Sequence, residues 1–345
     1  MEGLRTETRR ENRPSLEEVL NNRVVDALWK QDVLGEGFEQ LKLSLPDNAV
    51  ATLVRYQSDE ETDPEPVAAG ADVLYVHGWS NYFFQRKLAS FWHRNGARFF
   101  ALDLHNYGRS LRPGNTLGYV NDLRDYDGDL GAALEAMGRL PGKPLILLGH
   151  STGGLTLSWW VHRHPGVATA LILNSPWLEF QGAEIGRRAI SPLVQLQARR
   201  HPLAPLPVQD PGIYSRSLSS EFGGQWTYNK SWRPYRGFPV TSAFLNAVFQ
   251  AQNAVDAGLS IDVPILTMLS TRDYLQPRWT ETATEADVAL NVDVVAHRAL
   301  SLGNNVTVVR IPKAVHDIFL SPAPVRKNAY REMERWLGGY LNRRA

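Results

Sequence analysis

The chain has 345 residues, of which 43% are hydrophobic and 21% are charged, a mixture typical of a water-soluble globular protein. Its 37 Lys and Arg balance 36 Asp and Glu, so the net charge of +1 gives no electrostatic reason to expect nucleic acid or an anionic membrane as a partner. The absence of cysteine excludes disulfides, thiolate metal sites and a cysteine nucleophile. No apolar run approaches the roughly 18 residues of a membrane span, and the charged start does not resemble a secretory signal, so we expect a cytoplasmic protein.

The first part of the chain divides into a polar end and a pair of predicted strands. Residues 1–35 are rich in charge, and their one amphipathic stretch predicts a surface helix that follows a flexible end. Residues 39–57 contain two runs of alternating apolar positions, separated by Pro46-Asp47-Asn48. This pattern predicts two strands joined by a turn.

The rest of the chain has the pattern of α/β structure. Apolar runs without alternation predict strands that are buried on both faces, at residues 72–78, 98–104, 144–150, 169–175, 261–270 and 305–312. Helical stretches are predicted at residues 119–139, 153–163, 292–302 and 322–341. The alternation of strands and helices indicates a parallel sheet that is covered by helices on both faces.

Residues 176–260 interrupt this alternation. They contain eleven aromatic residues, and eight basic residues against five acidic ones, but no strong strand. Because a structureless insertion of this length is unusual inside a compact domain, we expect 176–260 to fold as a lid. The predicted core then consists of residues 36–175 and 261–345, and the polar segment 1–35 precedes it.

One motif carries the chemistry. Gly149-His150-Ser151-Thr152-Gly153-Gly154 follows the strand predicted at 144–150 and precedes the helix predicted at 153–163. The pattern G-x-S-x-G in this context is a nucleophile elbow, a turn so tight that side chains two residues before and after the serine would collide. Such a turn lifts the hydroxyl of Ser151 out of the sheet and directs the backbone N–H of Thr152 to the space beside it.

A second backbone donor is predicted at the end of the strand 72–78. His77-Gly78-Trp79 stands there, and the N–H of Trp79 would point to the same space as that of Thr152. Two such donors can stabilise the oxyanion of an acyl-transfer reaction. We expect the side chain of His77 itself to have a structural role.

The serine also needs a base, and His316 is the best placed of the nine histidines. A serine hydroxyl is a poor nucleophile at neutral pH unless a group such as imidazole takes its proton. His316 alone follows the final predicted strand, in a loop that opens before the last predicted helix. We therefore predict that His316 is the base.

Two aspartates are candidates for the acid that orients this imidazole. Asp273 follows the strand 261–270, and Asp287 precedes the helix that leads to the last strand. One loop, one helix and one strand take roughly 25–35 residues, a range that includes the separation of Asp287 from His316 but not that of Asp273. The spacing favours Asp287, and Asp273 remains the alternative.

Together these residues resemble the α/β-hydrolase family, and within it the group of monoglyceride lipases, lysophospholipases and serine aminopeptidases. The resemblance covers about residues 40–345, including Asp103, the turn at residues 106–110, the elbow and His316-Asp317. It implies an eight-stranded, mostly parallel sheet with a lid at 176–260, and hydrolysis through an acyl-enzyme without a cofactor. Epoxide hydrolases and haloalkane dehalogenases have aspartate at the elbow, so Ser151 favours acyl transfer.

The resemblance leaves the acid open. Relatives of this type usually place it soon after strand seven, which suits Asp273. The segment Asp287-Val-Ala-Leu-Asn-Val292, however, resembles the acid segment of a bacterial subgroup in which that loop is longer.

We therefore expect a serine hydrolase that cleaves small carboxylic esters with an apolar acyl part and uses no metal. Aromatic residues of the lid could line the acyl pocket, although most of them would form the core of the lid. An aminopeptidase or amidase on the same triad is one alternative, but the lid has few carboxylates to bind a substrate ammonium. A non-catalytic relative that binds a small ligand is another, and a strained elbow argues against it.

Overall fold

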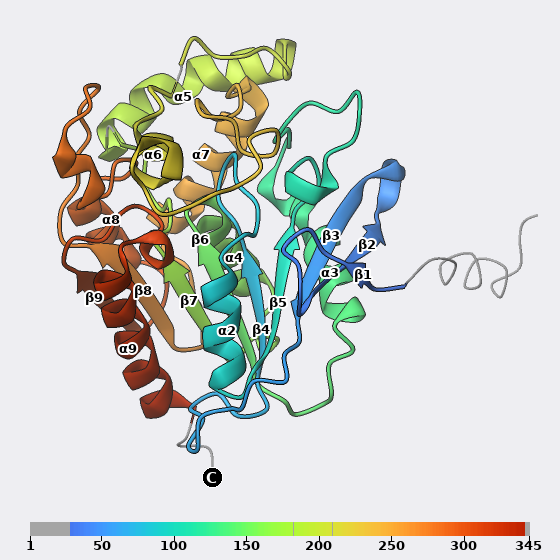
Figure 1. Ribbon diagram of the computed structural model, residues 1–345. Coiled ribbons are helices and arrows are strands. Elements are labelled where there is room, and N and C mark those ends of the chain that lie inside the picture. Colours follow the sequence, from blue (N-terminus) through green and yellow to red (C-terminus); the bar gives the residue numbers. More distant parts are fainter. Residues whose placement is uncertain (1–27, 182, 209, 342–345) are drawn as a thin grey trace, which may run out of the picture.

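The computed structural model describes residues 28–181, 183–208 and 210–341 (Figure 1). Within these ranges, nine strands form one sheet in the order β1-β2-β3-β5-β4-β6-β7-β8-β9. The strands are β1 (Lys30–Gln31), β2 (Phe38–Ser44), β3 (Val50–Tyr56), β4 (Asp72–Val76), β5 (Arg98–Asp103), β6 (Leu145–His150), β7 (Ala170–Asn174), β8 (Ile265–Ser270) and β9 (Val306–Ile311). The expected mostly parallel α/β-hydrolase sheet is confirmed, and the two-residue β1 adds a ninth strand to the eight that the resemblance implied.

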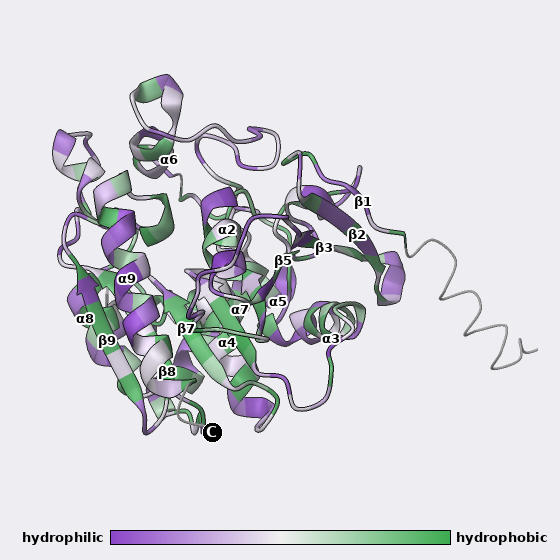
Figure 2. Ribbon diagram, turned by 60° about the horizontal axis from the view of Figure 1, so that its bottom comes forward, coloured by the Kyte–Doolittle hydropathy of each residue, from purple (hydrophilic) through white to green (hydrophobic). Residues whose placement is uncertain are grey.

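The sheet has an antiparallel edge and a parallel centre. The pairs β1–β2, β2–β3 and β3–β5 are antiparallel, whereas the six strands β5, β4, β6, β7, β8 and β9 run parallel to one another. All residues of β4, β6, β7 and β8 are buried, as strands covered on both faces must be. In contrast, β2 alternates between buried and exposed positions, and Figure 2 shows it as more hydrophilic than β7 and β8.

The hairpin at the edge closes at the predicted turn. Between β2 and β3, the 3₁₀ segment η1 (Pro46–Asn48) places Asp47 and Asn48 at φ angles of 55° and 56°. Asp and Asn tolerate this left-handed conformation better than most residues, and Pro46 sets the first φ angle of the turn. The surface helix expected in 1–35 rests mainly on residues before 28, outside the described residues.

Helices cover both faces of the sheet. They are α2 (Arg86–Arg94), α3 (Asp127–Ala136), α4 (Thr152–Arg163), α5 (Ala183–Arg200), α6 (Ile213–Leu218), α7 (Ser242–Ala257), α8 (Val292–Ala299) and α9 (Ala323–Tyr340). One core cluster joins the sheet to α3, α4, α7 and α8, and the other joins its opposite face to α2 and α9, which lie in front of the sheet in Figure 1. No helix of the described part is long and apolar enough to cross a membrane.

The segment between β7 and β8 corresponds to the predicted lid. It contains α5, α6, the 3₁₀ segment η4 (Ser220–Phe222) and α7, which gather at one end of the sheet, at the top of Figure 1. Helix α5 packs along α7, and α7 in turn buries Phe244, Val248 and Val255 in the larger core cluster. Helix α7 is therefore continuous with the core, whereas the division of the chain at 176 and 260 remains a prediction.

Candidate active site

Ser151 stands on a sharp turn between β6 and α4. Its φ of 52° and ψ of −116° lie in a region that residues with a side chain rarely adopt. A Cβ atom on Gly153 would lie 2.4 Å from the carbonyl oxygen of His77, and one on Gly149 would lie 2.6 Å from Cα of Gly154. Neither position accepts a side chain, as the motif predicts, and the turn packs directly against the end of β4.

Three predicted residues form one chain of hydrogen bonds. Nε2 of His316 lies 3.0 Å from Oγ of Ser151, and Nδ1 of His316 lies 2.9 Å from Oδ2 of Asp287. The other carboxylate oxygen of Asp287 accepts the backbone N–H groups of Ala289 and Leu290, at 2.8 Å and 2.9 Å. A hydroxyl, an imidazole and a carboxylate in this order can transfer the hydroxyl proton to the imidazole.

The two candidate acids lie side by side, but only one faces the histidine. Asp273 and Asp287 are paired in a short parallel bridge, in which the N–H of Tyr274 donates to the carbonyl of Asp287. Oδ2 of Asp273 accepts the N–H of Val292 at the start of α8, at 3.1 Å. Burial, together with the nearby Asp287, raises the pKa of Asp273. The carboxylate that meets His316 is thus the one that the spacing favoured.

The predicted backbone donors flank Ser151. A Cβ atom on Gly78 would lie 2.8 Å from Cβ of Ser151, so Trp79 follows a residue that touches the serine. Thr152 is the next residue after Ser151, and no hydrogen bond recorded between described residues uses the N–H of Trp79 or of Thr152. Both groups can therefore donate to a ligand atom beside the serine.

The side chain of His77 has the structural contacts that we expected. Its Nε2 accepts the N–H of Leu104 at 3.1 Å, so the ring proton is on Nδ1, which donates to the carbonyl of Gly78 at 2.8 Å. Burial lowers the pKa of His77, which keeps the ring neutral. His77 thus ties the end of β4 to the end of β5.

A buried ion network holds the loop that carries Trp79. Oδ1 of Asp103 accepts the N–H of Phe83 at 2.9 Å, and Oδ2 accepts Nη1 of Arg109 at 2.8 Å. Arg109 also binds both carboxylate oxygens of Asp32, at 2.6 Å and 2.7 Å. Asp103 and Arg109 belong to the motifs that carried the family resemblance, but their role in positioning this loop was not predicted.

Sequence reasoning also missed the polar groups that surround His316. Asp317 is fully buried, and its carboxylate accepts the side-chain amides of Asn174 at 2.7 Å and Gln85 at 2.8 Å. The ring of His150 lies 4.9 Å from that of His316, between centroids, and burial lowers the pKa of His150 to about 4. In the sequence, the only sign of these roles was position. Asp317 directly follows His316, and His150 directly precedes Ser151.

Aromatic side chains from the segment 176–260 cover the site. Tyr214 of α6 meets the ring of His316 edge-on, with 5.3 Å between centroids. The indole of Trp79 stacks on Phe244 of α7 at 3.7 Å and meets Phe238 edge-on at 5.9 Å. Under this cover, Ser151 and His316 are only 8% and 3% exposed.

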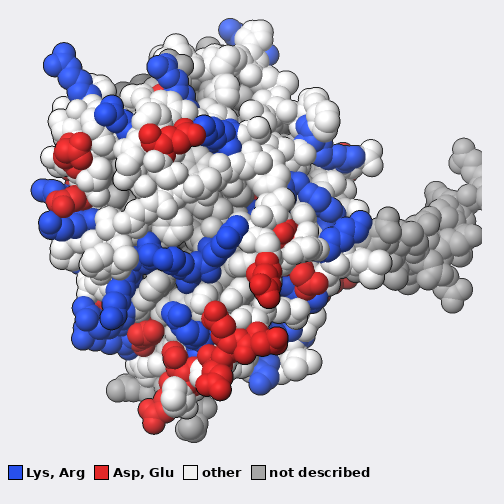
Figure 3. Space-filling model, viewed as in Figure 1, with Lys and Arg blue, Asp and Glu red and all other residues white. Residues whose placement is uncertain are grey.

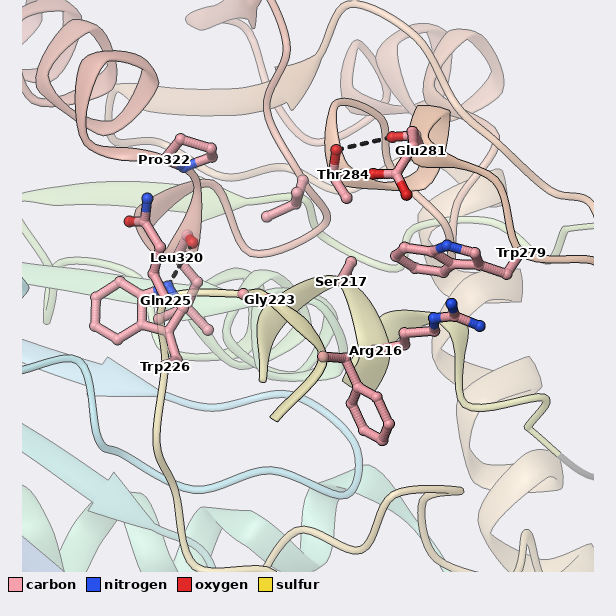
Figure 4. A pocket seen from close by; sticks show the side chains of 13 residues that line it. Arg216, Ser217, Gly223, Gln225, Trp226, Trp279, Glu281, Thr284, Leu320 and Pro322 are labelled. Carbon is pink, nitrogen blue, oxygen red and sulfur yellow. Dashed lines mark hydrogen bonds between the residues drawn. The ribbon is translucent and has the colours of Figure 1, made fainter. Parts of the chain in front are cut away.

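Two cavities of the described structure flank this covered site. One of about 330 Å³ lies beside the loop that carries His316 (Figure 4), where the guanidinium of Arg216 lies 4.4 Å from the ring of Trp279. The other, of about 440 Å³, borders Phe238 and is lined mainly by apolar residues of the segment 206–208 and by Pro239. Ser151 is not among the residues that line either cavity.

The visible surface carries both signs of charge. Figure 3 shows basic and acidic side chains on the same face, with acidic groups gathered low in the view. This mixture agrees with the nearly balanced composition of the chain.

The chain matches a known family along most of its length. The model of the Hydrolase_4 family, described as serine aminopeptidase, S33, matches residues 68–322. Phospholipase YtpA from Bacillus subtilis (strain 168) is 33% identical over 119 residues, which span 34% of this chain and 43% of that protein. The match therefore spans less than half the length of this relative.

Solved structures share the fold at low sequence identity. The monoacylglycerol lipase of Paleococcus ferrophilus superposes with a TM-score of 0.58 at 18% identity, over 83% of this chain and 99% of that one. A soluble variant of the Saccharomyces cerevisiae monoglyceride lipase superposes with a TM-score of 0.62 at 16% identity, over 91% of this chain and 98% of that one. A carboxyl esterase from Bacillus coagulans superposes with a TM-score of 0.59 at 13% identity, over 89% of this chain and 100% of that one.

The family match over residues 68–322 includes the positions of Ser151, Asp287 and His316. The chain therefore belongs to the serine aminopeptidase S33 family, and it shares the α/β-hydrolase fold of the solved lipases and esterases.

Proposed function

We propose that this protein hydrolyses carboxylic esters through an acyl-enzyme on Ser151, with His316 as the base and Asp287 as the orienting acid. The observation that carries the proposal is the unbroken run of hydrogen bonds from Ser151 through His316 to Asp287. The strained backbone at Ser151 supports it further, because strain of this kind persists only where the surrounding structure maintains it.

In the proposed reaction, Nε2 of His316 takes the proton of Ser151 as Oγ attacks the ester carbonyl. Asp287 keeps the ring proton on Nδ1 and stabilises the imidazolium that forms. The N–H groups of Trp79 and Thr152 donate to the oxyanion, a contribution worth about 10²–10³ in rate per donor. His316 then gives its proton to the leaving alcohol oxygen, and a water that it activates releases the acid from Ser151.

We propose that the acyl part of the ester is apolar and binds beside Trp79. Phe238 and Phe244 are buried against the indole, and the cavity of about 440 Å³ adjoins Phe238. The aromatic cover from the segment 176–260 would act as the lid of this pocket. A largely apolar wall with a few polar groups is typical of a small-molecule site.

Replacement of the nucleophile tests the proposal directly. Ser151→Ala should abolish turnover of p-nitrophenyl butyrate and labelling by a fluorophosphonate, while the circular dichroism spectrum stays that of the wild type. Ser231→Ala, at an exposed position of the same protein, serves as the matched control. Undiminished turnover in Ser151→Ala, or a wild type that is neither labelled nor active, would contradict the proposal, and the second result would favour a non-catalytic ligand-binding protein.

An aminopeptidase or amidase on the same triad is the second candidate, and the description of the matched family favours it. The chemistry of acyl transfer from an amide needs the same three residues. Side-by-side rates on aminoacyl anilides and on esters of matched acyl length distinguish the two functions. A higher kcat/KM on the anilides would overturn the ester assignment but not the triad.

A further inference from the structure

Arg233 is a buried cation with no acidic partner. Its side chain belongs to a residue that is only 3% exposed, and no carboxylate among the described residues forms an ion pair with it. Arg109 and Arg187 are equally buried but paired, Arg109 with Asp32 and Asp103, and Arg187 with Glu179. Arg326, which is 5% exposed, also has no carboxylate partner among the described residues, but it donates to the carbonyl of Ser321 at 2.8 Å. An unpaired buried charge is costly, so a partner that is not part of the protein would explain why it is kept.

Two tyrosines hold this guanidinium without neutralising it. The rings of Tyr214 and Tyr228 lie 4.8 Å and 4.5 Å from its central carbon, and Nη1 donates to Oγ of Ser215 at 3.3 Å. Stacking covers the faces of a guanidinium but leaves the N–H groups at its edge able to donate. Arg233 is thus held in one orientation with most of its hydrogen-bonding capacity unused.

The guanidinium of Arg233 lies close to the proposed base, His316. The ring of Tyr214 that contacts Arg233 also meets the ring of His316, so one aromatic side chain separates the cation from the base. The hydroxyl of Tyr214 is buried and has no hydrogen-bond partner among the described residues.

We propose that Arg233, with the hydroxyl of Tyr214, forms a subsite for an anionic group on the alcohol part of the ester, a carboxylate or a phosphate. This inference rests on the proposed esterase function, and it further specifies that the alcohol part of the substrate is negatively charged. The alcohol side is assigned because His316 must protonate the leaving oxygen, so the leaving group lies on the His316 side of Ser151. The apolar acyl part lies on the other side, beside Trp79 and Phe238.

The test uses butyrate esters of phenol and of phenols that carry one charged substituent at the meta position. They are the esters of phenol, 3-hydroxybenzoate, 3-hydroxyphenyl phosphate and 3-hydroxybenzylamine, with acid release followed in a pH-stat. The wild type should show a higher kcat/KM for the carboxylate ester, the phosphate ester or both than for the phenyl ester, by about 10- to 100-fold for a charge-assisted contact. The two anionic arms identify which oxyanion the subsite accepts, and the ammonium ester should be the poorest substrate.

Variants of the arginine complete the test. Arg233→Met should lower the ratio of anionic to neutral kcat/KM about tenfold or more, mainly through KM, and Arg233→Lys should retain part of it because the charge remains. Arg200→Met, an exposed arginine of α5, should leave the ratio at the wild-type value. The ratio of anionic to neutral kcat/KM is compared between each variant and the wild type. In this comparison, differences in the intrinsic reactivity of the esters and in the amount of folded enzyme cancel.

Each outcome has one meaning for the proposal. Turnover of the neutral ester without preference for either anionic ester, or a preference that persists in Arg233→Met, overturns the anionic subsite and leaves the esterase function standing. A preference for the ammonium ester overturns it as well. No turnover of any of the four esters, by an enzyme with a native circular dichroism spectrum, contradicts the proposed function itself.

Discussion

The amide of Asn174, at the end of β7, is hydrogen-bonded to the carboxylate of Asp317 at 2.7 Å, directly beside the proposed base. The carbonyl oxygen of the same amide accepts the N–H of Ile318 at 3.1 Å. Asn174 thus makes two bonds to the two residues that follow His316, and Gln85 satisfies the other oxygen of Asp317 at 2.8 Å. These bonds attach the histidine loop to the sheet.

Removal of Asp317 should loosen this attachment. Asp317→Ala leaves the buried amides of Asn174 and Gln85 without an acceptor, at about 1–3 kcal/mol each, so the midpoint of urea unfolding and kcat should both fall. The exchange Asn174→Asp with Asp317→Asn restores an acid–amide pair and should recover more of kcat than either single change. If the double variant is no better than the single ones, the pair does not act by positioning the loop.

The two aspartates should differ sharply in their effect on turnover. Asp287→Asn removes the acceptor for Nδ1 of His316 and should lower kcat on p-nitrophenyl butyrate by on the order of 10³–10⁴. Asp273→Asn, whose carboxylate bonds the start of α8, should change kcat less than tenfold. The matched pair decides the acid, since equal losses, or the larger loss in Asp273→Asn, would disprove the assignment.

The free energy of unfolding should decrease as the pH is lowered, because His150 is buried and takes up a proton less readily in the folded protein than in the unfolded chain. Burial lowers its pKa to about 4, whereas in the unfolded chain it titrates near ~6.5. Between these values the unfolded chain binds a proton that the folded protein does not. The stabilising contribution is therefore fully present above pH ~6.5 and lost as the pH falls towards 4, by up to about 3 kcal/mol.

Urea unfolding at several pH values between 7 and 4.5 measures this contribution. His150→Asn keeps a donor for the carbonyl of Asn174 but cannot titrate, so its free energy of unfolding should depend less on pH than that of the wild type. Parallel slopes for the two proteins would show that His150 does not carry the effect.

Glycines of the elbow and of a surface helix should respond in opposite ways to alanine. Gly153→Ala places a Cβ 2.4 Å from the carbonyl of His77, so it should abolish turnover and lower the unfolding temperature. Gly128→Ala in α3 meets no atom within 4 Å and should stabilise the protein by about 0.5–1 kcal/mol. Thermal unfolding and ester turnover of the two variants give the comparison, and an active Gly153→Ala enzyme would be incompatible with the packing of the turn.

Local patterns were enough to predict the buried strands and the sharp turn at Ser151, and they selected His316 as the residue that we propose as the base. The strands β4, β6, β7 and β8 are buried on both faces, so nearly all of their residues are apolar. Such short, continuous apolar runs can be recognised in the sequence. The helix expected at 119–139 is shorter, since α3 begins at Asp127 after the 3₁₀ segment η3 (Leu123–Tyr126), which Asp122 caps. Boundaries of this kind depend on caps and neighbours more than on periodicity.

By itself, the sequence determined the class of the fold, the nucleophile motif and the place of His316, because glycine spacing and apolar runs act over a few residues. The tertiary structure alone decided which of two adjacent carboxylates faces the imidazole, since Asp273 and Asp287 lie in one bridge but their carboxylates bond to Val292 and to His316, respectively. It alone revealed the pairing of Asp317 with Asn174 and the missing counter-charge of Arg233. Electrostatic partners and burial are properties of residues far apart in the chain, and only folding brings them together.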